Sequence, residues 1–343
     1  MMTGLTRRFA MAASLSLALG TGLAHAQTPE VFYKGRQMIM VVYSPPGSTY
    51  DLYARALVRH MPRHIPGEPN FIVQNMPGAG GLKAMDYLYN IAPKDGSVMG
   101  TVGRGLAFEP MLGHKEFKFD PMRFTWIGSM SRDVSLAISW NTSPVKTLAD
   151  LQKNQLLTPG TGAGADSEIM PLAYNALAGT KFKVINGYPN TVQAALALES
   201  GELDGIAYWA WGSINSSKPD WIRDKKVNVL FHTGDKPLPQ LPGVPSIREA
   251  AQNDLDRKAL DFLLAREILS RPFLAPPDIP ADRVKVLRNA FNATMKDPAF
   301  LQEAERAALE IELVTSEETE KVLRSAAQSP PDVINRVKSL LGR

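Results

Sequence analysis

The sequence predicts an α/β protein of two domains, in which mostly parallel β-sheets are covered by helices. Two observations lead to this class. Short apolar segments alternate with stretches of helical periodicity, and turn-forming residues separate them, which is typical of parallel sheets with helices on both faces. The chain of 343 residues is also long enough for two domains with separate cores.

In the N-terminal half, short apolar strands lead through loops into helices. The run MIMVV stops at the breaker sequence SPPG, so a strand is expected at 39–42. Asp51 follows where a side-chain oxygen is well placed to cap a helix over 51–60. By the same reasoning, strands are predicted at 72–74, 98–102, 124–127 and 135–138, and a helix near 82–90.

The alternation continues in the C-terminal half. The predicted strands are 155–158, 183–186, 203–208 and 227–231, and the predicted helices are 148–154, 167–177 and 191–199. From Ala281 onward the chain is predicted to be almost entirely helical. Its apolar residues Val284, Leu287, Phe291 and Met295 recur there at helical spacing.

The N-terminus has the three parts of a secretory signal peptide. Two arginines precede an apolar run over 9–23, and AHA at its end is a small-x-small cleavage site. We therefore expect a signal peptide over 1–26, a mature chain from Gln27 and a periplasmic location. The apolar run is too short to span a bilayer. Both the Sec and the twin-arginine export routes stay open.

Charge and cysteine content exclude several classes of function. The formal charge is +4, and 38 Lys and Arg residues are dispersed among 34 Asp and Glu residues, which argues against nucleic-acid binding. Because the chain has no cysteine, neither a disulfide nor a lipidated cysteine anchor is available to it.

Two loops of similar design indicate an anion site. YSPPGSTYD at 43–51 and QNMPGAGG at 74–81 each follow an apolar strand and lead into a predicted helix. Free backbone N–H groups and the positive end of a helix dipole attract an anion at such places. The alternative is that Pro and Gly only mark two strand-to-helix turns. The presence of two such loops in one chain favours the anion site.

Catalytic and metal-binding patterns are weak. The sequence has no HExxH, no GxSxG and no cysteine nucleophile. His60 and His64 have the i, i+4 spacing of two metal ligands on a helix, but no acid or cysteine accompanies them at ligand spacing. A solvated basic helix face is the favoured interpretation. We therefore expect no enzymatic activity, no catalytic residue, no metal and no cofactor.

One loop offers an alternative function. GTGAGA at 160–165 follows a predicted strand, precedes a helix and fits the G-x-G-x-x-A dinucleotide pattern. The acidic residue expected at the end of the next strand is missing, because the chain there reads Ile185-Asn186-Gly187. An exported nicotinamide-dependent oxidoreductase therefore stays the alternative hypothesis. In either case the loop is suited to hold an anion through its backbone.

An ordered set of motifs resembles a known family across the whole mature chain. The motifs are PPG-x-x-x-D, VQNMPGAGG, APKDGSVMGTV, TPGTGAGADSE, NGYPNTVQAALALESGELDGIAYW, LPGVPSIREA and RPFLAPPDIPADRVKVLRNAF. In this order they resemble the receptors of tripartite tricarboxylate transporters, the Bug-type periplasmic solute-binding proteins. Each motif alone is a weak signal, whereas the ordered set is specific.

The resemblance implies a fold and a function. Receptors of this family are two-lobed periplasmic binding proteins of a type II-like fold, and their lobes close about a hinge on a small carboxylate. The implied ligand is a di- or tricarboxylate or an aromatic acid. The implied partners are the large and small integral membrane subunits of a transporter, and the receptor itself is expected to be a monomer without catalytic activity.

The two lobes are expected to be built from interleaved parts of the chain. Glycine-rich loops before Arg104 and after Leu157 must face each other across the cleft, which requires two crossings between lobes. We expect lobe 1 to contain 27–130 and 232–343, and lobe 2 to contain 131–231.

The resemblance also suggests where the ligand binds. The expected ligand-binding residues are Gly47, Ser48, Thr49, Tyr50 and Asp51 in the first lobe, and Thr161, Gly162, Ala163, Asp166, Ser167 and Tyr188 in the second. Most relatives have a second glycine where this chain has Ser48, whose side chain adds a donor but restricts the backbone. For Asp51, helix capping is favoured over ligand contact. Residues 78–81 are expected to shape the cleft wall.

Two features depart from the family pattern. Arg104, at the end of a predicted strand, is placed to bind a ligand carboxylate through two hydrogen bonds, although a surface arginine fits the sequence equally well. Tyr208, Trp209 and Trp211 follow another strand, and three aromatic residues so close together cannot all face one core. We expect Tyr208 and Trp209 to line the cleft, which favours an aromatic or longer-chain acid.

Overall fold

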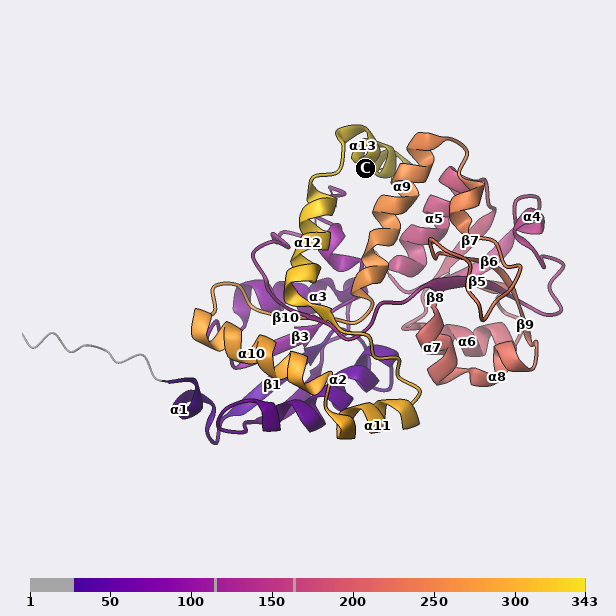
Figure 1. Cartoon of the computed structure of the whole chain (residues 1–343). Helices are drawn as coiled ribbons and strands as arrows, with labels where there is room; N and C mark the ends of the chain where they lie inside the picture. Colours follow the sequence, from indigo (N-terminus) through magenta and orange to yellow (C-terminus); the bar gives the residue numbers. More distant parts are fainter. Residues whose placement is uncertain (1–27, 114–115, 163–164, 343) are drawn as a thin grey trace, which may run out of the picture.

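The computed structural model describes residues 28–113, 116–162 and 165–342 (Figure 1). The predicted signal peptide and the candidate Ala163 lie outside these residues. Within the described part of the chain, no helix is long and apolar enough to cross a membrane.

The first sheet has six strands in the order β11-β4-β10-β3-β1-β2. Their bounds are β1 Gln37–Val42, β2 Asn70–Asn75, β3 Val98–Thr101, β4 Thr125–Ser129, β10 Pro272–Ala275 and β11 Val314–Thr315. β1 runs parallel to β2 and β3, whereas β10 is antiparallel to both β3 and β4, and β11 is antiparallel to β4. The sheet therefore joins strands from both ends of the chain.

The remaining strands form a second group. In it, β5 (Ser135–Trp140) lies between β8 (Gly205–Ala210) and β9 (Val227–His232), antiparallel to both. β6 (Leu156–Gly160) and β7 (Phe182–Asn186) form a parallel pair. β6 lies beside β8, because the Ala207 N–H donates to Thr158 Oγ1 at 2.9 Å.

The predicted α/β class is confirmed, but the prediction of mostly parallel sheets is wrong. β5 enters the second group directly from β4 through a short connection, and β10 returns to the first sheet from the second group. Two neighbouring strands can be parallel only if a crossover connection, usually a helix, joins them. No such crossover leads to β5 or to β10 from a neighbouring strand of the same sheet. Both strands run antiparallel to their neighbours, so the sheets are mixed.

Helices cover both faces of each sheet (Figure 1). Their bounds are α1 Pro29–Tyr33, α2 Thr49–His60, α3 Leu82–Asp86, α4 Leu148–Leu151, α5 Asp166–Ala178, α6 Thr191–Glu199, α7 Trp211–Ser217, α8 Pro219–Arg223, α9 Asp254–Leu264, α10 Ala281–Thr294, α11 Pro298–Arg306, α12 Ser316–Ala327 and α13 Pro331–Leu340. One cluster packs α2, α10 and α11 on the first sheet, and another packs α6, α7 and α8 on the second.

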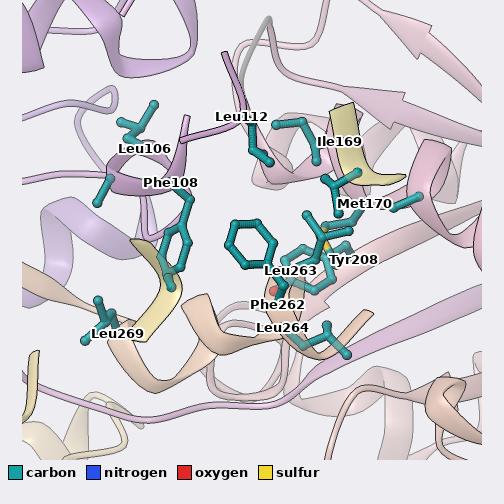
Figure 2. Packing of buried hydrophobic residues seen from close by; sticks show 14 of the residues in the cluster. Leu106, Phe108, Leu112, Ile169, Met170, Tyr208, Phe262, Leu263, Leu264 and Leu269 are labelled. Atoms are coloured by element: carbon teal, nitrogen blue, oxygen red, sulfur yellow. The ribbon is translucent and has the colours of Figure 1, made fainter. Parts of the chain in front are cut away.

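A third hydrophobic cluster joins the two halves of the molecule. Figure 2 shows Phe108, from the segment after β3, and Phe262 of α9 in the same cluster as Met170 of α5 and Tyr208 of β8. α9 packs against both α5 and α13. The strands of the first sheet come from 37–129 and 272–315, and those of the second group come from 135–232. The later helices α9 and α13 nevertheless pack on α5, which belongs to the second group. The division into the two expected lobes remains a proposal.

Two chain segments cross between the sheets side by side. The Met130 N–H donates to the Arg271 carbonyl at 3.0 Å, and the Ser270 N–H donates to the Ser131 carbonyl at 3.1 Å. Further along, the Asp133 N–H donates to the Glu267 carbonyl at 3.2 Å. We call segments 130–134 and 265–271 the hinge segments, because they run together between β4, β5 and β10.

The contact between β5 and β8 leaves no space for a side chain at Gly205. A Cβ there would lie 2.3 Å from the Ile138 carbonyl oxygen and 2.7 Å from Leu156 Cδ2. We predict that Gly205→Ala lowers the free energy of unfolding by about 1–3 kcal/mol, the usual cost of overpacking, in urea denaturation. Lys183→Ala, at an exposed position of β7, serves as control and should change it by less than about 0.5 kcal/mol. Equal stability of the two variants would contradict this packing.

Candidate functional site

A cavity of about 500 Å³ lies between the two groups of strands. Its lining comes from the loops that follow β1, β2 and β3 on one side and β6, β7 and β8 on the other. Ligands of open α/β sheets bind at the carboxyl ends of strands, so the position of this cavity is that of a binding site.

The first turn of α2 forms one wall of the cavity. Ser48 is the N-cap, and its Oγ accepts a hydrogen bond from the Asp51 N–H at 3.3 Å. Thr49 and Tyr50 follow, and their backbone N–H groups have no acceptor among the described residues. All three of Ser48, Thr49 and Tyr50 line the cavity. At Ser48 φ is −70°, so serine in place of the family's second glycine causes no backbone strain.

Asp51 and Gly47 support this turn from behind and are not part of the lining. The Asp51 carboxylate accepts hydrogen bonds at 2.9 Å from the Gly47 N–H, Asn75 Nδ2 and Arg55 Nε. Burial alone would raise the pKa of Asp51, but the hydrogen bonds from Arg55, Gly47 and Asn75 outweigh it and lower the pKa. The prediction of Asp51 as helix cap is wrong, because Ser48, three residues earlier, is the N-cap and Asp51 lies in the first turn of α2.

The loop after β6 and the start of α5 form the opposite wall. Thr161, Asp166 and Ser167 line the cavity, and Ser167 Oγ accepts a hydrogen bond from the Thr161 N–H at 3.0 Å. Gly162 is not in the lining, but a Cβ on it would lie 3.2 Å from the Gly80 nitrogen. The loops of the two sides therefore nearly touch, and residues 78–81 line the cavity as expected.

Tyr188 does not line the cavity. Its hydroxyl donates to Glu202 Oε1 at 2.6 Å, and burial together with Glu202 raises the pKa of Tyr188 to about 12. The next residues, Pro189 to Val192, do line it, and the Asn190 side chain caps α6 by accepting from the Gln193 N–H. The helix at 191–199 was predicted from the sequence, but its start was not expected to line the cavity, although an Asn before a helical run is a recognisable N-cap signal.

Arg104 is buried, with 5% of its surface exposed, and lines the cavity. Its Nε donates to Asp166 at 3.1 Å, its Nη2 donates to Ser135 Oγ at 2.7 Å, and its guanidinium lies 4.5 Å from the Tyr208 ring. The surface interpretation of Arg104 is therefore wrong. Arg266, which has no exposed surface, donates to the other oxygen of Asp166 at 2.6 Å. One carboxylate thus pairs with two buried arginines.

Aromatic rings occupy both sides of the cavity. Tyr208 and Trp209 belong to its lining, whereas Trp211 borders a separate pocket near the hinge segments. Tyr43 and Tyr50, from the first side, pack edge to face with ring centroids 4.9 Å apart and also line the cavity. Neither Tyr43 nor the further lining residue Arg271 was named as a ligand contact from the sequence, although Tyr43 begins the predicted anion loop at 43–51 and Arg271 begins the last of the family motifs.

His60, the last residue of α2, and His64, at the end of the 3₁₀ helix that follows, bind separate partners. His60 Nε2 lies 2.7 Å from Glu303, and His64 Nε2 lies 2.8 Å from Asp297, so each ring pairs with a different acid. Among the residues that the structure describes, no group of three or more His, Cys, Asp and Glu side chains is arranged to hold a metal ion.

Comparison with known proteins identifies the family. Residues 54–338 match the tripartite tricarboxylate transporter family receptor. The chain belongs to this family. A curated relative, the "UPF0065 protein in tcbD-tcbE intergenic region" of Pseudomonas sp. (strain P51), is 26% identical over 245 residues, which cover 70% of each chain.

Solved structures that include a periplasmic binding protein have the same fold. The periplasmic binding protein BugD superposes with a TM-score of 0.70 at 21% identity, covering 90% of this chain and 98% of BugD. MatC from Rhodopseudomonas palustris, solved with bound malate, gives a TM-score of 0.67 at 19% identity, covering 89% and 99% of the two chains. The two-lobed binding-protein fold is thereby established.

The pairing of Asp166 with two arginines makes a prediction about stability. Asp166→Ala leaves the Arg104 and Arg266 charges buried without their partner, which should lower the free energy of unfolding by about 3–5 kcal/mol. Glu168→Ala, two residues further along α5, is the control and should cost less than about 1 kcal/mol. Urea denaturation measures both. A small loss for Asp166→Ala would show that these ion pairs do not form in solution.

The pKa of Asp133, in a hinge segment, predicts how the stability of the protein depends on pH. Burial outweighs the attraction of Arg271 and raises the pKa of Asp133 from 3.8 to about 7. The native protein then holds a proton that the unfolded chain has released, so stability should fall as the pH rises from about 4 to about 7. Asp133→Asn imitates the protonated form and should gain stability relative to wild type by a few kcal/mol across this window, in urea denaturation at several pH values. If the difference in free energy of unfolding between Asp133→Asn and wild type stayed the same at every pH, the raised pKa would be contradicted.

Proposed function

We propose that the protein is an extracytoplasmic receptor that captures a small carboxylate in the 500 Å³ cavity and delivers it to a tripartite membrane transporter. The observation that carries this proposal is the convergence of three helix starts, those of α2, α5 and α6, on one cavity. Each presents unsatisfied N–H groups and the positive end of a helix dipole, which favour an anion.

The cavity has the properties of a small-molecule site. Its volume lies within the range of about 300–1,000 Å³ that is common for ligand pockets. Aromatic rings such as Tyr50, Tyr208 and Trp209 provide apolar walls, and Arg104 adds a positive charge. Such a lining suits an organic acid with an apolar body, including an aromatic or longer-chain carboxylate.

Family membership supports the rest of the proposal. The family description names a receptor of a tripartite transporter, and the related MatC was solved with malate. We infer that this chain is exported by its N-terminal signal, acts in the periplasm as a monomer, and meets integral membrane subunits there.

We further infer binding without turnover. Asp166 is the one acidic side chain among the described residues of the cavity lining, and its pairing with two arginines leaves it poorly suited to act as a base. The alternative oxidoreductase would need an acid at the end of β7, where Asn186 stands. A nicotinamide that copurifies with the protein, seen as absorbance beyond the protein band, would favour the alternative.

The α2 turn provides the test of carboxylate binding. Gly47 has a φ of 77°, and no atom lies within 4 Å of a Cβ built on it, so Gly47→Val should disturb the turn through backbone strain alone. We predict that this variant binds the best acid from a thermal-shift screen of mono-, di- and tricarboxylates at least about tenfold more weakly, as measured by calorimetric titration. Thr49→Ala should have a smaller effect, because its hydroxyl is one donor among several.

Gly201→Val is the matched control, since Gly201 has a φ of 79° and equally open space but lies outside the cavity lining. It should bear similar backbone strain and keep full affinity. If folded Gly47→Val protein bound the acid as tightly as Gly201→Val, the α2 turn would not be the binding site.

A further inference from the structure

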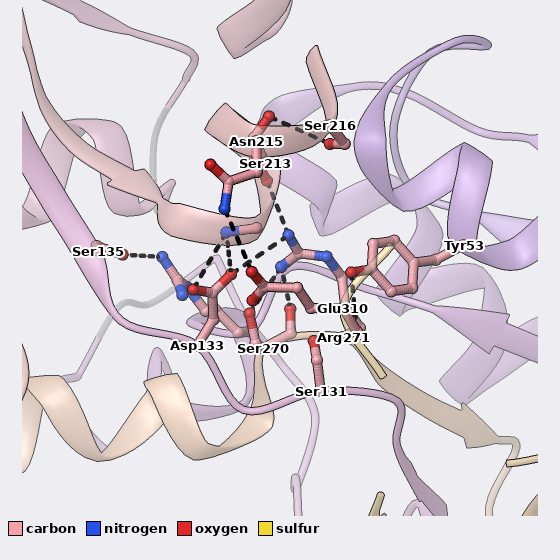
Figure 3. Close-up of polar contacts among 12 residues, drawn as sticks. Tyr53, Ser131, Asp133, Ser135, Ser213, Asn215, Ser216, Ser270, Arg271 and Glu310 are labelled. Carbon is pink, nitrogen blue, oxygen red and sulfur yellow. Dashed lines mark hydrogen bonds and ion pairs between the residues drawn. The ribbon is translucent and has the colours of Figure 1, made fainter. Parts of the chain in front are cut away.

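Arg271 is a buried cation at the point where a hinge segment enters β10. One per cent of its surface is exposed, and it belongs to the cavity lining. Its Nη1 donates to the Ser270 carbonyl and hydroxyl oxygens at 2.7 Å, and its Nη2 donates to Ser213 Oγ at 2.8 Å (Figure 3). The guanidinium also lies 5.0 Å from the Tyr50 ring, in the first turn of α2. The group is therefore held rigidly next to the proposed anion site.

Arg271 differs from the other buried arginines because no carboxylate in the described part of the chain accepts a hydrogen bond from it. Arg104 and Arg266 both donate hydrogen bonds to Asp166. For Arg271 the nearest carboxylate is Asp133, with 3.9 Å between Nη2 and Oδ2, and Asp133 accepts instead from the Gly212 N–H at 3.1 Å. The Nε of Arg271 has no hydrogen-bond partner among the described residues.

The surroundings of Asp133 weaken this compensation further. Arg271 and Arg104 attract a negative charge on Asp133, whereas Glu310 and Glu267 repel it, and its side chain is 3% exposed. Burial dominates and raises the pKa of Asp133 to about 7, so the carboxyl is partly protonated near neutral pH. Arg271 is then a desolvated cation without a full counter-charge, which is a costly arrangement unless an anion completes it.

A purely structural role does not account for a charge at this position. The hydrogen bonds to Ser213 and Ser270 fasten the hinge segment, but a neutral donor would serve that purpose without the desolvation cost. The cavity itself supplies the missing reason. Among the charged lining residues, Arg104 already donates to Asp166, a carboxylate that it shares with Arg266, whereas Arg271 donates to no carboxylate of the described residues and adds positive charge beside the helix starts.

We propose that Arg271 is a specificity-determining contact of the cavity, which adds a full positive charge to the helix termini and makes the receptor prefer ligands with two negative charges. This inference rests on the proposed function, since it concerns the same cavity. A ligand with one acid group satisfies the N–H groups of α2. A second acid group on the ligand supplies the counter-charge that Arg271 lacks.

The test compares diacids with singly charged counterparts of nearly the same shape. Succinate, adipate and terephthalate are each titrated into the mature protein beside their monoamides, which have one negative charge, by isothermal titration calorimetry. We expect wild type to bind at least one diacid about tenfold or more tightly than its monoamide, as charged hydrogen bonds of this strength imply. Arg271→Gln should lose most of that preference by weakening the diacid and not the monoamide, whereas Arg271→Lys should retain part of it.

Arg132→Gln is the matched control, because Arg132 is a hinge-segment arginine that pairs with Glu312 and Glu318 outside this cavity. It should keep the wild-type preference. Circular dichroism and thermal unfolding establish that each variant is folded. If Arg271→Gln does not fold, a reduced preference in folded Arg271→Lys supports the inference, and an unchanged preference in folded Arg271→Lys overturns it.

The outcomes separate this inference from the proposed function. Equal affinity of wild type for each diacid and its monoamide, or an unchanged preference in folded Arg271→Gln, overturns the role of Arg271 and leaves carboxylate binding intact. Failure of the folded wild-type protein to bind any carboxylate of this set or of the wider screen overturns the proposed function, and the inference with it.

Discussion

The carboxylate of Asp166 holds two buried guanidinium groups from different parts of the chain, and the shape of the cavity depends on this contact. Arg104 comes from the loop after β3, Arg266 from the hinge segment after α9, and Asp166 from the first turn of α5. Because these three charged groups are buried, their contact stabilises the structure only while all three are present. The contact therefore fixes the loops of the two sides at the separation that leaves a cavity between them.

Near this contact, the N-termini of three helices line the same cavity. α2, α5 and α6 each begin just after a strand, at the carboxyl ends of the sheets. Backbone N–H groups do not depend on side-chain identity, so such a site can be kept while the lining changes. In the proposed function, residues such as Arg271 and Trp209, which line the cavity, would determine which acid fits.

Much of this arrangement could be predicted from local sequence. Breaker residues after apolar runs located β1 and the start of α2, and helical periodicity with its flanking residues located α6 at 191–199. β10 was missed because it is a four-residue strand that begins with proline and pairs with two strands far away in sequence. The role of Ser48 in place of Asp51 could not be decided, since both residue types cap helices. The position of Arg271 in the cavity arises from the crossing of the hinge segments, which no local pattern records.

A crystal structure of the mature protein with the best-bound carboxylate tests the central claim most directly. We predict that the acid lies in the cavity between the sheets, with a carboxylate oxygen about 2.7–3.2 Å from the backbone nitrogens of Thr49 and Tyr50. A carboxylate bound at another surface, or one that lies in this cavity without contacting the first turn of α2, would contradict it.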